Sequence, residues 1–198
     1  MHKALLLDAD GVTILAPQPY SFTYAEQQGL NPASIEPFFK GPFQEALRGK
    51  ANLKELISQH HDTWKIDNPD QFLRDWFAAE NVPAIAIQSI ITECQSKGTP
   101  VFLATNQESY RTTYLREVMF PHVFNGMLVS CELGFTKNEP GFWQAALSEI
   151  AKSIPGIIPS EILYFDDSET YITSAAHAGI DARLFEGPHQ IREVMGLA

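Results

Sequence analysis

The chain has few basic residues, few cysteines and no long apolar stretch. It contains 14 Lys and Arg residues against 24 Asp and Glu residues, which gives a formal net charge of -10. Binding to a nucleic-acid backbone depends on clustered Lys and Arg, so this balance argues against general affinity for nucleic acid. No apolar run approaches the length of a membrane span, and the N-terminus lacks the pattern of a signal peptide. We therefore expect a soluble cytoplasmic protein that binds neither nucleic acid nor membrane.

Two cysteines, Cys94 and Cys131, are present, with no CxxC spacing and no cluster of histidines nearby. This pattern favours free thiols in a reducing compartment over a disulfide or a zinc site. The sequence does not distinguish a monomer from a homodimer.

Short apolar runs that end in small or polar residues predict the buried strands of an α/β fold. Segments with helical spacing of apolar residues lie between these runs. This alternation predicts a Rossmann-like parallel sheet with helices on both faces, joined by right-handed crossovers. The expected strands are 3–10, 99–106, 162–167 and 180–186, with 126–132 as a fifth, and the expected helices are 84–97, 108–119, 141–153 and 169–178.

Residues 16–82 interrupt this alternation. The segment contains no convincing strand, whereas its Phe, Leu, Ile and Trp residues recur at helical spacing. We expect a small all-helical cap domain at 16–82, inserted after the first strand of an α/β core formed by 1–15 and 83–198.

Polar side chains follow the apolar runs at the points where the strands should end. Asp8 and Asp10 follow the first run, Thr105 and Asn106 follow the second, and Asp166 and Asp167 follow a later one. Ligands of open parallel sheets bind at the carboxyl ends of the strands. We therefore expect these side chains to line one crevice, together with Lys137 from a loop.

Phosphoryl transfer is the chemistry that needs such a set. In an acidic protein, a phosphate site must supply positive charge locally, through a metal ion or a placed lysine. Mg²⁺ binds carboxylates with water and substrate phosphate, and a cation also explains how the acidic side chains can lie close together. A carboxylate can act as the nucleophile, which divides one hard displacement into two easier ones.

Four short motifs, in order, resemble those of the haloacid dehalogenase (HAD)-like hydrolases, in particular the phosphatase-type branch with a helical cap. The stretch "DADGV" at 8–12 resembles the first motif, and "LATN" at 103–106 the second. Lys137 resembles the third motif, and "YFDDSE" at 164–169 the acidic fourth. One motif alone would be weak evidence, but their order and spacing agree over nearly the whole chain.

This resemblance implies a role for each matched residue. Asp8 would be the nucleophile, and Asp10 the general acid and base. Thr105 and Asn106 would bind the phosphoryl oxygens, while Lys137 would hold Asp8 and the phosphate in register. The implied Mg²⁺ ligands are Asp8, the Asp10 backbone carbonyl, Asp166 and Asp167.

The resemblance also implies a cap that closes over the crevice and excludes water. Within this segment, Lys40 and Arg48 are the candidate contacts to the substrate. Two departures from the family pattern stand near the site: Asn138 replaces a proline found in many relatives, and Tyr171 and Ile172 stand where an asparagine is common.

Simpler readings exist for each motif taken alone. An Asp-x-Asp-Gly stretch can be an ordinary turn, and Thr105 with Asn106, or the pair Asp166 and Asp167, can cap the helix that follows. A lone Lys137 can be a solvated lysine. The combined pattern favours a Mg²⁺-dependent phosphatase acting on a small phosphorylated metabolite. A phosphomutase, a haloacid dehalogenase and a catalytically silent binding module remain as alternatives.

Overall fold

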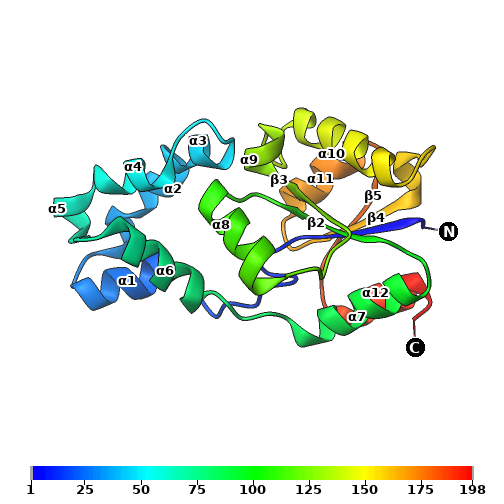
Figure 1. The fold of residues 1–198 in the computed structure, drawn as a ribbon, viewed down its shortest axis with the longest axis horizontal. Coiled ribbons are helices and arrows are strands. Elements are labelled where there is room, and N and C mark those ends of the chain that lie inside the picture. The colour runs from blue at the N-terminus through cyan, green and yellow to red at the C-terminus, as the bar shows by residue number, and fades with distance from the viewer. Residues whose placement is uncertain (1, 198) are drawn as a thin grey trace.

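The computed structural model, which describes residues 2–197, contains a five-stranded parallel sheet in the order β3-β2-β1-β4-β5 (Figure 1). The α/β class predicted from the sequence is therefore confirmed. The strands are β1 (Ala4–Leu7), β2 (Val101–Thr105), β3 (Gly126–Val129), β4 (Ile162–Asp166) and β5 (Asp181–Leu184). The helices flanking the sheet are α7 (Ile85–Ser96), α8 (Ser109–Tyr114), α9 (Ser130–Leu133), α10 (Pro140–Ser153), α11 (Glu169–His177) and α12 (Pro188–Met195).

Alternation of side chains along β1 explains why helices cover both faces of the sheet. Leu6 packs in the apolar cluster that includes residues of α10 and α11, whereas Leu5 and Leu7 pack in the cluster that includes residues of α7 and α12. Figure 1 shows these two pairs of helices on opposite sides of the sheet. Because β1 pairs with β2 on one side and with β4 on the other, it is the central strand of the sheet.

The segment between β1 and α7 is helical and forms its own apolar cluster at the end of the molecule away from both termini (Figure 1). We refer to residues 20–79 as the helical insertion; its role as a cap stays a prediction. Phe38, Trp64 and Phe77 are buried in this cluster. The elements of the insertion are α1 (Tyr20–Gln28), η1 (Pro32–Ser34), α2 (Glu36–Lys40), α3 (Phe43–Leu47), α4 (Leu53–Ser58), α5 (His61–Trp64) and α6 (Pro69–Ala79).

Two buried or half-buried arginines tie the helical insertion to the α/β core. Arg111 of α8 is 3% exposed and donates a hydrogen bond to the backbone carbonyl of Phe77 at 3.2 Å. On the other side, Arg48 follows α3 and donates from Nε to the carboxylate of Glu139 at 3.0 Å. The insertion is thus fixed on both sides of the carboxyl edge of the sheet.

The structure corrects the predicted secondary structure at three places. Residues 130–132, expected to end a strand, begin α9, because β3 stops at Val129. The predicted helix 108–119 changes after Tyr114 into a π-helical turn, Leu115–Met119. Helix α12 was not predicted, although Pro188 at its first position and Gly196 after its end are signals of helix termini. A further short 3-10 turn, η3 (Pro159–Glu161), precedes β4.

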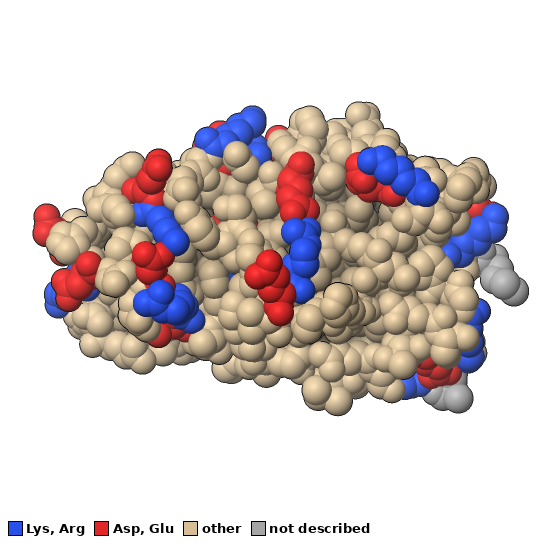
Figure 2. Space-filling view, in the orientation of Figure 1, with Lys and Arg blue, Asp and Glu red and all other residues tan. Residues whose placement is uncertain are grey.

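Charged side chains are interspersed on the molecular surface. On the face shown in Figure 2, basic and acidic side chains lie next to one another. The surface ion pairs include Arg116 with Glu132 at 2.9 Å and Lys152 with Glu149 at 2.6 Å. Within residues 2–197, no helix is both long enough and apolar enough to span a bilayer.

Candidate functional site

The sheet order brings together the predicted site residues that end or follow the strands. Asp8 follows β1, while Thr105 and Asp166 end β2 and β4, the two strands that flank β1. The chain runs from β1 outward to β2 and β3 and then crosses back to β4 on the other side of β1, and such a reversal of strand order creates the crevice typical of ligand sites in open parallel sheets. Six predicted residues line one cavity of about 530 Å³ at this edge: Asp8, Asp10, Thr105, Asn106, Lys137 and Asp167.

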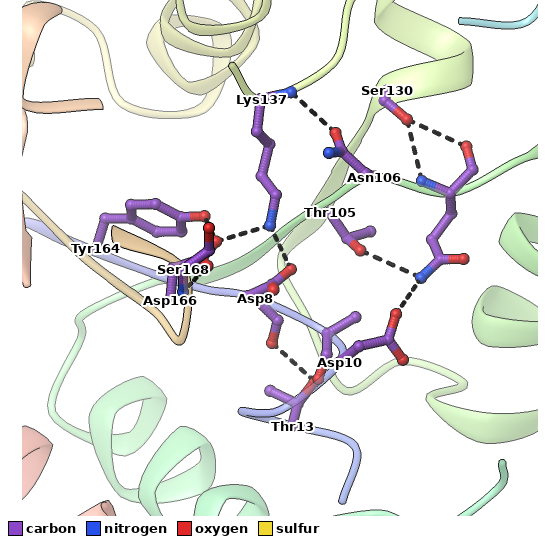
Figure 3. Close-up of polar contacts among 12 residues, drawn as sticks. Asp8, Asp10, Thr13, Thr105, Asn106, Ser130, Lys137, Tyr164, Asp166 and Ser168 are labelled. Atoms are coloured by element: carbon purple, nitrogen blue, oxygen red, sulfur yellow. Dashed lines mark hydrogen bonds and ion pairs between the residues drawn. The ribbon is translucent and has the colours of Figure 1, made fainter. Parts of the chain in front are cut away.

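Lys137 bridges two buried carboxylates at the centre of the site (Figure 3). Its Nζ atom lies 2.6 Å from Oδ1 of Asp8 and 2.7 Å from Oδ2 of Asp166. The exposed fraction is 1% for Lys137, 6% for Asp8 and 0% for Asp166. Tyr164 donates a hydrogen bond to Oδ2 of Asp166, and the backbone N–H of Ser168 donates to Oδ1 at 2.8 Å. The reading of Lys137 as a solvated lysine is therefore wrong.

Burial and like charge control the protonation of this cluster. Burial raises the pKa of Asp8 to about 7, because the loss of solvation outweighs the attraction of Lys137. Burial lowers the pKa of Lys137, but Asp8 and Asp166 outweigh this effect and raise it overall. Burial, followed by the repulsion of Asp166, also raises the pKa of Asp167. One ammonium group therefore does not neutralise the acidic cluster.

Asp8, Asp166 and Asp167 have the composition of a site for a hard divalent cation. Each offers a carboxylate oxygen, and these atoms lie within 4.8 Å of one another. Oxygen ligands of this kind suit Mg²⁺, and a divalent cation would supply the charge that Lys137 alone does not. The three side chains thus fit a magnesium ion, with water and a substrate oxygen as the remaining ligands.

Gly11 allows Asp167 to approach this cluster. Its φ angle is +81°, and a Cβ atom at this position would lie 2.1 Å from Oδ2 of Asp167. Two features therefore require glycine at this position of the "DADGV" motif: the left-handed backbone conformation and the close approach of the Asp167 carboxylate.

Asp10 points away from Asp8 and is held by a residue that the sequence analysis missed (Figure 3). Gln107 donates from Nε2 to Oδ2 of Asp10 at 2.7 Å, and the same nitrogen lies 3.4 Å from Oγ1 of Thr105. Asn106 accepts a hydrogen bond from the backbone N–H of Lys137 at 2.9 Å, which joins β2 to the lysine loop. The reading of Thr105 and Asn106 as a helix cap is wrong, because Glu108 caps α8 instead.

Asn138 and Tyr171, which depart from the motif pattern, both make contacts near the site. Thr136 lies within hydrogen-bond distance of both Asn138, at 2.6 Å, and Glu139, at 2.7 Å, so side chains order the loop without a proline. The ring of Tyr171 lies 4.5 Å from Nζ of Lys137, a cation–π contact at the wall of the cavity.

The helical insertion contributes Gln44 and Leu47 to the cavity, not the two basic residues predicted from the sequence. Lys40 pairs with Glu36 at 2.5 Å and its side chain is 74% exposed, outside the cavity lining. Arg48 is held by Glu139, as described above, and by the backbone carbonyl of Gln44 at 3.0 Å. The structure therefore does not bring Lys40 and Arg48 into the site.

Two signals in the sequence could have identified the missed residues. Gln107 directly follows Asn106 at the end of a predicted strand, where side chains reach the crevice. Tyr164 stands two positions before Asp166 on β4, so that both side chains point to the same face of the sheet. No comparable signal marked Gln44 and Leu47.

Comparisons with known proteins identify the fold. No protein-family model matches the sequence, and no curated protein matches it either. Among solved structures, a HAD family enzyme from Bacteroides thetaiotaomicron superposes with a TM-score of 0.78 at 19% identity, covering 98% of both chains. A predicted HAD-like family hydrolase from Porphyromonas gingivalis gives a TM-score of 0.78 at 18% identity, with 98% of both chains covered.

Two further similarities concern bound ligands and chemistry. A mutant of the Bacteroides enzyme, in complex with magnesium and inorganic phosphate, gives a TM-score of 0.75 at 21% identity and covers 93% of this chain and 94% of its own. A dehalogenase with an intermediate complex gives a TM-score of 0.70 at 12% identity, covering 98% of this chain and 96% of its own. The chain has the HAD-like fold, as the motifs predicted.

Proposed function

We propose that the protein is a Mg²⁺-dependent phosphatase of the HAD type that hydrolyses a small phosphorylated metabolite through an aspartyl-phosphate intermediate. The observation that carries this proposal is the cluster in which Lys137 contacts both Asp8 and Asp166, and in which the Asp8 carboxylate lies close to those of residues 166 and 167, with Asp10 two residues further along the chain. The phosphate and magnesium bound by the similar Bacteroides protein support the same chemistry.

In the first step, the Asp8 carboxylate attacks phosphorus, and a bond forms between its oxygen and the phosphorus atom. The bond from phosphorus to the oxygen of the leaving alcohol breaks, and Asp10 donates a proton to that oxygen. Lys137 orients Asp8 and, with Thr105 and Asn106, stabilises negative charge on the transferring phosphoryl group.

In the second step, a water molecule attacks the phosphorus of the aspartyl phosphate. Asp10, now a carboxylate, takes a proton from this water, and the bond between Asp8 and phosphorus breaks to release inorganic phosphate. Atoms and charges balance, because Asp10 regains the proton that it gave to the alcohol.

Asp8, Asp166 and Asp167 would hold the magnesium ion. When bound, Mg²⁺ neutralises charge on the phosphate and lets the anionic nucleophile and substrate approach each other.

The charges of the side chains that line the cavity favour a leaving group that is uncharged. Lys137 is the one cationic side chain among the residues that line the cavity, and two carboxylates enclose it. The remaining wall carries neutral side chains such as Gln44, Leu47 and Thr170. A second phosphate or a carboxylate on the substrate would find no cation there, whereas hydroxyl groups would find amide and hydroxyl partners.

Two alternatives use the same nucleophile. A phosphomutase would return the phosphoryl group to a second hydroxyl of the substrate instead of water. A haloacid dehalogenase is favoured by one finding, the similarity to a dehalogenase structure. That reaction needs neither a metal ion nor an acid at position 10, so the acidic trio and Asp10 weigh against it.

Hydrolysis of p-nitrophenyl phosphate tests the proposal. We expect turnover by the wild-type protein with Mg²⁺, and its loss both with a chelator and in the variant Asp8→Asn. Asp181→Asn is the matched control, because Asp181 lies on β5, outside the cavity lining, and pairs with His2 and Arg183. Equal rates for the wild type and Asp8→Asn would contradict the proposal.

A further inference from the structure

Gln107 occupies a position that the proposed mechanism has not used. Gln107 is 7% exposed, and its side chain reaches from the end of β2 to Asp10, an exposed residue that lines the cavity. A buried amide that holds an exposed carboxylate costs solvation and side-chain entropy, so the contact calls for a functional explanation.

A buried serine fixes the backbone of Gln107. Ser130, the first residue of α9, is 0% exposed. Its hydroxyl accepts a hydrogen bond from the backbone N–H of Gln107 at 3.0 Å and donates to the backbone carbonyl of the same residue at 3.2 Å. Figure 3 labels Ser130, Thr105 and Asp10, to which Gln107 forms hydrogen bonds. With both backbone groups held by one side chain, the point from which the Gln107 side chain extends is fixed.

The amide nitrogen determines which oxygen of Asp10 can carry a proton. An amide NH₂ group only donates hydrogen bonds, so Oδ2 of Asp10, 2.7 Å away, must act as an acceptor. The hydroxyl oxygen of a protonated carboxyl group accepts a hydrogen bond more weakly than its carbonyl oxygen, so a proton on Oδ2 would weaken this bond. The proton that Asp10 carries is therefore placed on Oδ1.

The same nitrogen also orients Thr105. Nε2 also donates to Oγ1 of Thr105, with 3.4 Å between the nitrogen and the oxygen. A hydroxyl that accepts here keeps its own hydrogen for a phosphoryl oxygen. Gln107 thus links the acid that protonates the leaving group to a residue that binds the phosphoryl group.

We infer that Gln107 is a positioning residue that sets the orientation and the proton-bearing oxygen of Asp10, the general acid. This inference rests on the proposed phosphatase function. It predicts that Gln107 matters most for phosphate esters whose alcohol must be protonated as it leaves. It matters less for p-nitrophenyl phosphate, whose leaving group departs as a stabilised anion.

The test compares an alkyl phosphate, glycerol phosphate, with p-nitrophenyl phosphate in the variant Gln107→Leu, which keeps the side-chain size and removes the donor. We expect kcat/KM for the alkyl ester to fall about 10 to 100 times more than kcat/KM for the aryl ester, since a general acid contributes about 10²–10⁴-fold. Ser130→Ala should change this ratio in the same direction by a smaller factor. Thr112→Ala is the control, because this buried hydroxyl donates to the Glu108 carbonyl and is not among the residues that line the cavity.

A double-mutant cycle separates positioning from a general loss of structure. In the Asp10→Asn background, Gln107→Leu should leave the ratio of the single-turnover rates of the first step for the two esters unchanged, because the group that it positions is already lost. An unchanged ratio for Gln107→Leu in an active Asp10 enzyme would overturn the inference while leaving the phosphatase proposal intact. A wild-type protein that hydrolyses neither ester would overturn both.

Discussion

Replacing Lys137 with methionine should destabilise the protein, and more so at higher pH. The change removes the ammonium group that lies 2.6 Å from Asp8 and 2.7 Å from Asp166, but keeps a side chain of similar length. All three residues are buried, so the two carboxylates would have no cation beside them. Breaking a buried ion pair by removing one partner costs about 3–5 kcal/mol. For a chain of this size, that loss corresponds to a fall in Tm of roughly 6–20 °C.

The pH dependence follows from the pKa of Asp8. Burial already raises this pKa from 3.8 to about 7, and removing Lys137 removes an influence that lowers it. A carboxyl whose folded-state pKa lies above its unfolded value stabilises the fold at low pH and loses that contribution as pH rises through the folded pKa. In Lys137→Met the folded protein keeps the Asp8 proton to higher pH than the wild type. The loss in the free energy of unfolding of Lys137→Met, relative to the wild type, therefore grows by up to about 1.4 kcal/mol per pH unit above pH 7.

Urea unfolding followed by circular dichroism, with a chelator at pH 6 and pH 8, measures both effects. The control is Lys152→Met, whose side chain is 69% exposed and pairs with Glu149 at the surface. Removing a surface pair of this kind should change stability by no more than about 1 kcal/mol at either pH. The reasoning would be refuted if Lys137→Met lost as little free energy of unfolding as the control. It would also be refuted if this loss were smaller at pH 8 than at pH 6.

Three further predictions concern the metal site and the cavity. Gly11→Ala should weaken Mg²⁺ binding at least about 10-fold in calorimetry, because the new Cβ displaces Asp167; Gly98→Ala, with a φ of +82° and open space around it, should not. Since Asp8 must lose its proton to bind the ion and its pKa is about 7, the apparent Mg²⁺ affinity should fall below pH 7 by up to about 10-fold per pH unit; equal affinities at pH 6 and pH 8 would contradict this. Wild-type kcat/KM should be higher for monophosphates of neutral polyols than for those with a carboxylate, and Gln44→Lys should narrow this preference in a substrate panel; a wild-type preference for the anionic esters would oppose our account of the cavity.

Much of the site could be anticipated because parallel strands bring their carboxyl ends to one edge. Asp8, Thr105 and Asp166 are far apart in the chain, but each ends or follows an apolar run, and the fold rule then places them together. The strand pattern also located Lys137 only loosely, as part of a loop between strands. Its burial between two carboxylates depends on the three-dimensional structure and has no local signal.

The predictions from the sequence are wrong where contacts between distant parts of the chain outweigh the local pattern of apolar and charged residues. The sequence predicts Lys40 and Arg48 as substrate contacts because they are basic residues of the helical segment. Acidic neighbours bind both, and the neutral residues Gln44 and Leu47 line the cavity instead. Apolar spacing does not show which face of a short helix meets the crevice. The sequence predicts a strand through residue 132, but Ser130 begins a helix, and its hydroxyl forms hydrogen bonds with the backbone of Gln107.

The most direct test of the central claim is to trap the phosphorylated nucleophile. Asp10→Asn lacks the base that activates water in the second step, while p-nitrophenyl phosphate needs no acid in the first. We therefore expect this variant, mixed with Mg²⁺ and p-nitrophenyl phosphate, to release one equivalent of p-nitrophenol in a burst. Mass spectrometry of the acid-quenched protein should find one phosphoryl group on the peptide that carries Asp8. A burst with no phosphoryl group on Asp8, or with the group on another residue, would contradict the account.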